Sequence, residues 1–129
     1  MKTLVEHINE ALKIGKNLSD WTTYTYQPKT RGELKDIIRS RISKDGTNCD
    51  LNDIDTSLIT NMSYLFYGSK FNGEISRWDV SKVNDMFAMF ASSKFNQDIS
   101  KWKINKNCDT SDIFKNCPIK EEYKPKLPR

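Results

Sequence analysis

The apolar residues near the start of the chain recur at the spacing of an amphipathic helix. In residues 3–16 they fall close to a 3.6-residue period, and the residues between them are mostly polar. The apolar positions are Leu4, Val5, Ile8, Leu12 and Ile14. We therefore predict a first helix here that docks through one apolar face.

A second helix is predicted after Thr30. Thr30 and Glu33 have the T-x-x-E spacing of a capping box, in which the two side chains satisfy backbone N–H groups at a helix start. Its apolar face consists of Leu34, Ile37, Ile38 and Ile42. Gly46 follows as a typical helix stop, so the helix is predicted to end just before it.

From about residue 48 the pattern changes to a repeat. Residues 55–78 and 79–102 align without a gap and are identical at 11 of 24 positions, and weaker copies extend the array over residues 48–117. Met62, Leu65 and Phe66 have the i, i+3, i+4 spacing that predicts a short helix in each unit. Ile75 and Ile99 are predicted to lie in short parallel strands, and the Asp, Asn and Ser residues of the repeat are predicted to form turns and caps.

A period in the range of 20–29 residues is typical of leucine-rich repeats, whose units bury their apolar faces against their neighbours. We predict an α/β fold, a short leucine-rich-repeat-like solenoid of 24-residue units capped by two N-terminal helices. The predicted organisation is one folded domain with a helical N-terminal cap over residues 1–47, a repeat solenoid over residues 48–117 and a basic C-terminal tail over residues 118–129.

The repeat phrase also carries a family resemblance. Residues 71–90 read F-N-x-[ED]-I-S-x-W-D-V-S-x-V-x-x-M-x-x-[ML]-F in composite form, which resembles the repeat of BspA-type leucine-rich-repeat proteins. The resemblance covers residues 50–117 and implies a thin repeat protein that binds a partner and has no catalytic activity. Short members of this kind resemble proteins of phages and other mobile elements, for which inhibition of a host defence complex is an expected role.

Composition excludes several classes of protein. The net charge is +4, distributed as +3, −2 and +3 over residues 1–46, 47–102 and 103–129, which is too small to identify a nucleic-acid binder by itself. No run of about 18 apolar residues is present, so no membrane span is predicted. The start of the chain does not read as a secretory signal, and we expect a cytoplasmic protein.

Catalytic and metal-binding motifs are absent from the sequence. Three cysteines without CxxC pairing predict reduced, packed thiols and no zinc site. His7 is the single histidine and has no nucleophile near it in sequence. The acidic residues 50–55 lack the glycine and the distal glutamate of a calcium loop, and we assign them to turns. We expect no enzymatic activity, no cofactor and no metal.

Two sets of residues are candidates for partner binding. The repeat period places basic side chains in columns, and this set consists of Lys70, Lys94, Arg77, Lys101, Lys103 and Lys106. The second set consists of Tyr64, Tyr67 and Phe87, which are predicted to face outward if the Met62 face points inward. Packing of these aromatic side chains against the N-terminal helices is an equally good interpretation.

Three functions remain open from the sequence. The first is a binding module that engages a protein or ribonucleoprotein partner and inhibits or modulates it. The second is direct RNA binding through the basic columns and the C-terminal tail. The third is self-association through the C-terminal end of the repeat, where Ile113, Phe114 and Ile119 are predicted to be incompletely covered.

Overall fold

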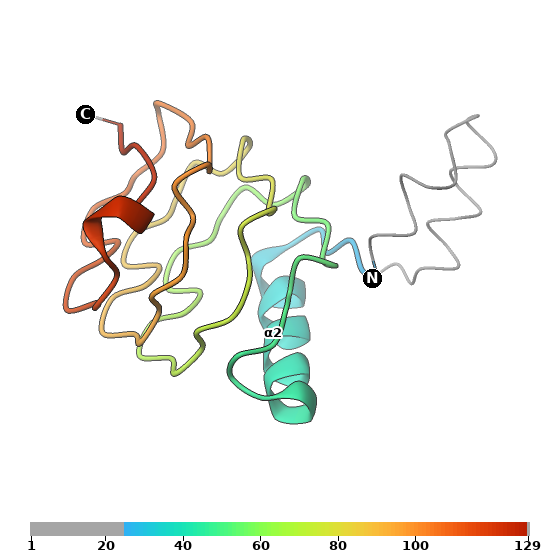
Figure 1. Ribbon diagram of the computed structural model, residues 1–129. Coiled ribbons are helices and arrows are strands. Elements are labelled where there is room, and N and C mark those ends of the chain that lie inside the picture. The colour runs from blue at the N-terminus through green and yellow to red at the C-terminus, as the bar shows by residue number, and fades with distance from the viewer. Residues whose placement is uncertain (1–24, 129) are drawn as a thin grey trace.

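The computed structural model describes residues 25–128 of the chain. The described part contains one α-helix, α2 (Arg31–Asp45), one 3-10 helix, η2 (Glu121–Tyr123), and a long series of turns. Helix α2 lies at one end of the turns, and the C-terminal segment lies at the opposite end (Figure 1). The first predicted helix, residues 3–16, and His7 lie outside the described residues.

Helix α2 forms where the sequence predicts a helix after Thr30. The Thr30 side chain caps it by accepting a hydrogen bond from the Glu33 N–H at 3.2 Å. The Glu33 carboxylate reaches back to the N–H of Lys29 at 3.0 Å, one residue before the cap. At the other end, the Gly46 N–H donates to the Ile42 carbonyl with Gly46 at φ 92°. This helix prediction is confirmed.

Three segments of consecutive β-turns follow, and we call them turn rows 1, 2 and 3, at residues 61–69, 85–93 and 109–117. Within row 1, alternate N–H groups donate to the carbonyl three residues earlier: Leu65 to Met62, Tyr67 to Tyr64 and Ser69 to Phe66. The other N–H groups donate to row 2 over 2.8–3.0 Å: Met62 to Asp85, Tyr64 to Phe87, Phe66 to Met89 and Gly68 to Ala91. Row 2 is joined to row 3 in the same way, so the rows lie side by side.

The predicted α/β leucine-rich-repeat-like solenoid with two N-terminal helices is wrong. Between residues 25 and 128 there is one α-helix and no β-sheet, because parallel pairing is limited to isolated bridges such as Asn61 with Asp85 and Asp85 with Asp109. The predicted strands at Ile75 and Ile99 are irregular backbone. The repeat period therefore places similar segments side by side without building regular strands.

The predicted helix through Met62, Leu65 and Phe66 is also wrong. Tyr64 adopts φ 57°, which interrupts a right-handed helix, and Ala88 at the equivalent place in row 2 adopts φ 53°. The N–H groups that a helix would bond internally are instead shared between turns and the neighbouring row. The i, i+3, i+4 spacing of apolar residues buries one face in consecutive turns as it does in a helix. The sequence pattern alone therefore could not distinguish the two structures.

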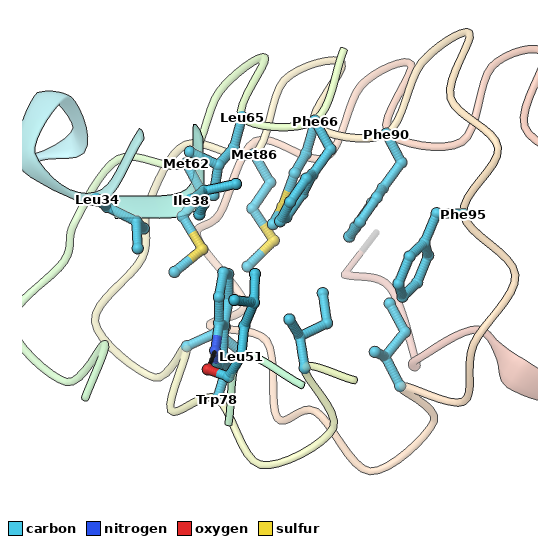
Figure 2. Packing of buried hydrophobic residues seen from close by; sticks show 14 of the residues in the cluster. Leu34, Ile38, Leu51, Met62, Leu65, Phe66, Trp78, Met86, Phe90 and Phe95 are labelled. Carbon is cyan, nitrogen blue, oxygen red and sulfur yellow. Dashed lines mark hydrogen bonds between the residues drawn. The ribbon is translucent and has the colours of Figure 1, made fainter. Parts of the chain in front are cut away.

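The core consists of side chains that recur at 24-residue intervals. Phe66 and Phe90 stack with ring centroids 5.4 Å apart, and Phe90 stacks on Phe114 at 5.7 Å. Trp78 and Trp102 are parallel at 6.5 Å, and their indole N–H groups donate to the Leu51 and Ile75 carbonyls at 2.9 and 3.0 Å. Figure 2 shows this single core cluster extending from Leu34 of α2 past Met62 and Phe66 to Phe90 and Phe95. Each aromatic pair adds about 0.5–1.5 kcal/mol beyond its burial.

Short polar side chains form the turns, as predicted. Asp55, Asp79 and Asp98 each accept a hydrogen bond from the N–H two residues later at 2.9–3.0 Å. Asn61 and Asp85 do the same at the start of rows 1 and 2. These bonds satisfy backbone groups that irregular backbone would otherwise leave unpaired.

The C-terminal segment packs beside the last unit. The Ile99 N–H donates to the Tyr123 carbonyl at 3.0 Å, and the Lys120 N–H donates to the Asn96 side chain at 3.0 Å. Ile113 and Ile119 are buried, whereas Phe114 is partly buried. The predicted incomplete cover is thus seen at Phe114 and not at the two isoleucines.

Candidate binding surfaces

An aromatic surface lies on turn row 1 and the start of row 2, formed by Tyr64, Tyr67 and Phe87. Tyr64 and Tyr67 are 44% and 55% exposed, and Phe87 is half-buried. Tyr64 occupies the left-handed position of its turn, and its backbone N–H is fixed by the Phe87 carbonyl at 2.9 Å. The turn rows therefore hold the three rings on one rigid backbone frame.

The three rings contact each other edge to face. Tyr64 lies 5.6 Å from Tyr67 and 5.4 Å from Phe87, with interplanar angles of 69° and 67°. This geometry is the favoured one for aromatic pairs, because the positive edge of one ring meets the negative face of the next. Among residues 25–128, neither tyrosine hydroxyl has a hydrogen-bond partner.

A shallow hollow of about 290 Å³ adjoins the aromatic surface. Small side chains form part of its lining, and polar side chains from row 3 complete it. The lining residues besides the three aromatics are Ala88, Ala91, Ser92, Asp112, Lys115 and Asn116. An inserted side chain would thus meet aromatic rings on one side and both a carboxylate and an ammonium group on the other.

Helix α2 approaches the aromatic surface without covering it. The Lys35 ammonium donates to the carbonyls of Tyr64 and Leu65 at 3.5 and 3.4 Å, while both tyrosine rings remain exposed. Burial, followed by the nearby Arg31 and Arg39 charges, lowers the pKa of Lys35 below its ordinary value. Packing of the tyrosines under α2, one of the two predicted interpretations, is therefore not observed; the first predicted helix lies outside the described residues.

The predicted basic columns are only partly brought together. Arg77, Lys101 and Lys103 line one surface hollow of about 310 Å³ over Trp78 and Trp102, and we call these three residues the basic groove. All three are exposed, and within residues 25–128 none of them forms a salt bridge. The remaining predicted residues, Lys70, Lys94 and Lys106, are exposed and do not line this hollow.

Acidic side chains accompany the basic groove. Asp79 lines the same hollow, and Glu74 and Asp98 line the adjoining one with Arg77 and Lys101. Hydrogen bonds from Ser100 lower the pKa of Asp98, which keeps its carboxylate ionised. The three cations therefore face three carboxylates, and the local charge is close to zero. Such a surface attracts phosphate weakly compared with a uniformly basic one.

Helix α2 is attached to the repeat region by an ion-pair network. Arg41 donates to both Asp53 carboxylate oxygens at 2.8 Å and pairs with Asp45 at 3.0 Å. Burial alone would lower the pKa of Arg41, but the hydrogen bonds to Asp53 and Asp45 raise it above its ordinary value. Arg41 therefore stays charged and stabilises the contact of the helix with the first unit.

Thiols and carboxylates do not assemble into a metal site in the described part of the chain. No group of three His, Cys, Asp or Glu side chains within residues 25–128 could hold a metal ion. Cys49, Cys108 and Cys117 are free thiols. Burial, followed by the charges of Asp85 and Asp109, raises the pKa of Cys108 to about 11, so this thiol is protonated at neutral pH.

Sequence reasoning missed the side chains that complete these surfaces. Asp112, Lys115 and Asn116 belong to the weakest repeat copy, yet they line the aromatic hollow because row 3 lies beside row 2. The 24-residue offset was the available signal, since Asp112 stands two periods after Tyr64. Arg31 and Lys35, which contact row 1, gave no such signal because a helix surface is normally polar.

The chain was compared with known proteins. Residues 36–122 match a protein family described as "Mycoplasma protein of unknown function, DUF285". No curated protein matches the chain, and no solved structure does. In residues 25–128, no helix has both the length and the apolar character needed to cross a membrane.

Proposed function

The chain belongs to the DUF285 family, and we propose that it is a non-catalytic binding module that engages a protein partner through Tyr64, Tyr67 and Phe87. The observation that carries this proposal is the exposure of two adjacent tyrosines, 44% and 55%, on a frame of paired turn rows. Tyrosine is enriched among the residues that dominate protein interfaces, because its ring buries much area while its hydroxyl can form a hydrogen bond.

The fold does not require these two tyrosines. Row 2 has alanine at both equivalent places, Ala88 and Ala91, and it keeps the same turns and the same left-handed conformation. A large aromatic side chain that the neighbouring copy does without supports a role outside packing. We propose that this role is contact with the partner.

A relation to BspA-type repeat proteins is part of the proposal. The phrase in residues 71–90 supports it, and the match to the DUF285 family overlaps that phrase. A cytoplasmic location is proposed as well, supported by the free thiols of Cys49, Cys108 and Cys117, which a reducing compartment favours. Inhibition of the partner, and a host defence complex as that partner, stay predictions.

Direct RNA binding is the less supported function. The basic groove of Arg77, Lys101 and Lys103 could contact phosphates, but Glu74, Asp79 and Asp98 adjoin it. Phosphate contacts make affinity fall steeply with salt, whereas an aromatic contact depends on salt only weakly. Salt response therefore separates the two functions.

The test compares the full chain with the variant Tyr64→Ala/Tyr67→Ala, which gives row 1 the alanines of row 2. Leu58→Ala is the matched control, because Leu58 is a 37% exposed apolar residue outside the aromatic surface. Partners captured by the tagged chain are identified, purified and titrated by calorimetry with all three chains, at low and high salt and with nuclease.

We expect the tyrosine variant to lose at least about 10-fold in affinity, a cost of about 1.4 kcal/mol, while Leu58→Ala binds normally. Binding that survives the tyrosine changes would contradict the proposal. If the partner is captured only when RNA is intact and is lost at high salt, the chain would instead bind RNA through the basic groove.

A further inference from the structure

Row 3, the last turn row, presents four backbone N–H groups to which no other segment of the described chain supplies an acceptor. In rows 1 and 2, four alternate N–H groups donate to the next row. The equivalent groups of row 3 belong to Thr110, Asp112, Phe114 and Asn116, and none of them has an acceptor within residues 25–128. We call these four N–H groups the donor edge.

The opposite side of the rows is partly closed. In row 2, the carbonyls of Phe87 and Met89 accept from row 1, and the equivalent carbonyls of row 1 are those of Ser63 and Leu65. These accept instead from α2, through the Arg31 guanidinium at 2.6 Å and the Lys35 ammonium at 3.4 Å. Side chains of α2 thus replace the donors that a preceding row would supply.

Within the described residues, the C-terminal segment supplies no hydrogen-bond acceptor to the donor edge. Its backbone pairs instead with Ile99, whose N–H donates to the Tyr123 carbonyl. Near the edge, the Lys124 ammonium lies over the Phe114 ring, 5.5 Å from its centre. Asp112 and Asn116 are exposed, and Phe114 is partly exposed.

Self-association does not suit this edge. Two copies that met through it would place N–H groups against N–H groups, which cannot hydrogen-bond. A head-to-tail contact would need the carbonyls of row 1, and Arg31 and Lys35 already occupy two of them. The complementary surface is therefore a segment that presents main-chain carbonyls.

We propose that the donor edge binds an extended or turn-forming segment of the protein partner, which adds its carbonyl groups as a fourth row. This inference rests on the proposed function and deepens it by specifying how the partner is held. Addition of a main-chain segment to an open edge is a recurrent mode of peptide recognition. Here the accepted segment pairs with turns, so its carbonyls must follow the alternate spacing of rows 2 and 3.

The edge also specifies one side chain of the partner. Phe66, Phe90 and Phe114 form a column with neighbouring rings 5.4 and 5.7 Å apart, at angles of 7° and 17°. The next ring of the column would stack on Phe114, and it would displace the Lys124 ammonium, which lies over the Phe114 ring. We infer an apolar, preferably aromatic, residue of the partner at this place, stacked on Phe114.

The donor edge and the aromatic surface are continuous. Asp112, Lys115 and Asn116 line the hollow beside Tyr64, Tyr67 and Phe87, and two of these three residues carry donors of the edge. One partner segment can therefore lie along the edge while a second part of the partner contacts the tyrosines.

The test uses the full isotope-labelled chain and a synthetic probe peptide, N-D-M-F-A-M-F-A-S-S-K, the sequence of residues 84–94. This peptide carries the carbonyls that row 2 offers to row 1. Nuclear magnetic resonance follows the shifts and the exchange rates of the Asp112, Phe114 and Asn116 amides. We expect saturable shifts at these amides and at least about 10-fold slower exchange with the peptide.

Three controls make the result specific. A peptide with Asp at its second Phe should bind at least about 10-fold more weakly, because it cannot stack on Phe114. The variant Phe114→Ala should weaken binding while the Ala88 amide stays protected, which shows that the fold is intact. Lys124→Ala, which uncovers the ring and leaves the edge unchanged, should bind at least as well as the wild type.

Unchanged edge amides at millimolar peptide would overturn the inference. Protection that rises with chain concentration in the absence of peptide would also overturn it, because the occupant would then be a second copy. The chain with Tyr64→Ala/Tyr67→Ala should still bind the probe. Loss of the natural partner in that variant with the probe retained separates the two proposals, so each can fail alone.

Discussion

The outermost backbone groups at the two ends of the series of turn rows differ in whether they are hydrogen-bonded. At the N-terminal end, Arg31 and Lys35 of α2 donate to the carbonyls of row 1. At the C-terminal end, the N–H groups of row 3 have no acceptor between residues 25 and 128, and the C-terminal segment pairs elsewhere. At the end that presents acceptors, two of the four carbonyls are thus bonded to α2, and we call it the closed end; at the end that presents donors, none of the four N–H groups is bonded within the described residues.

The difference shows what a helix contributes to such a repeat. The backbone groups inside an α-helix are hydrogen-bonded to one another, so the side of α2 contacts the edge with side chains, and long cationic side chains reach carbonyls well. The N–H edge would need carboxylates or carbonyls in return. Within residues 25–128, no carboxylate or carbonyl accepts from the four N–H groups of the donor edge. In our proposal, the protein partner supplies these acceptors.

The largest effect is expected at Gly73, beside the closed end. A Cβ there would lie 1.9 Å from the Cys49 carbonyl oxygen, in a region where the Asn72 and Glu74 N–H groups hold the backbone in place. Gly73→Ala should cost at least about 4 kcal/mol of unfolding free energy or prevent folding. Urea denaturation followed by tryptophan fluorescence measures it.

Gly68 supplies the control for this change. Gly68 has a positive φ, 65°, but a Cβ there would meet no atom within 4 Å, and Asn116 occupies the equivalent place of row 3 at φ 56°. Gly68→Asn should change stability by less than about 0.5 kcal/mol. Equal stability of the two variants would mean that Gly73 is not held against Cys49.

The next largest loss of stability is expected when an aromatic residue of row 2 is removed, compared with its counterpart in row 3. Phe90 is fully buried between Phe66 and Phe114, whereas Phe114 has one face of its ring without an aromatic neighbour among the described residues. Phe90→Ala should lose about 3–5 kcal/mol and Phe114→Ala about 1–2 kcal/mol in the same denaturation assay. If Phe114→Ala costs as much as Phe90→Ala, row 3 is covered and the comparison fails.

Removing the cap should open the closed end. Arg31→Ala/Lys35→Ala leaves the Ser63 and Leu65 carbonyls to water and should cost about 1–2 kcal/mol, since both donors are partly exposed. Arg39→Ala on the same helix is the control and should cost less than about 0.5 kcal/mol, because Arg39 is exposed. A double variant as stable as its control would show that α2 docks through its apolar face alone.

The smallest effect is a pH dependence at Cys108, just before row 3. Burial raises its pKa from 9.0 to about 11 in the folded chain, so the folded state keeps a proton that the unfolded state loses. Stability from this group is complete below pH 9 and falls as the pH rises toward about 11. Denaturation at pH 8 and pH 10 should show a smaller decrease for Cys108→Ala, and an identical decrease would contradict the burial of this thiol.

Part of the fold was predictable. Thr30, Glu33 and Gly46 are local signals, because capping groups and a helix stop act on their nearest neighbours in sequence, and α2 has the predicted bounds within a residue. The Asp and Asn residues of the turns were predictable for the same reason. Hydrogen bonds between residues close in sequence can be recognised from a short stretch of that sequence.

The turn rows and the edge were not predictable in this way. A row takes half of its hydrogen bonds from residues 23 positions away, and its left-handed residues include Tyr64 and Ala88, which carry no positive-φ signal. The aromatic surface was identified because the predicted inward face at Met62 and Phe66 is indeed buried, although the backbone is not helical. Partner binding by either surface stays a prediction.

Residue-resolved amide exchange of the free, full-length chain tests the central claim most directly. Tyr64, Ala88 and Asp112 occupy the same place in rows 1, 2 and 3, and only the first two donate to a neighbouring row within the described residues. After correction for intrinsic rates, the Asp112 amide should exchange at least about 100-fold faster than the other two. An Asp112 amide as slow as that of Ala88 would show that the edge is closed and would contradict the account.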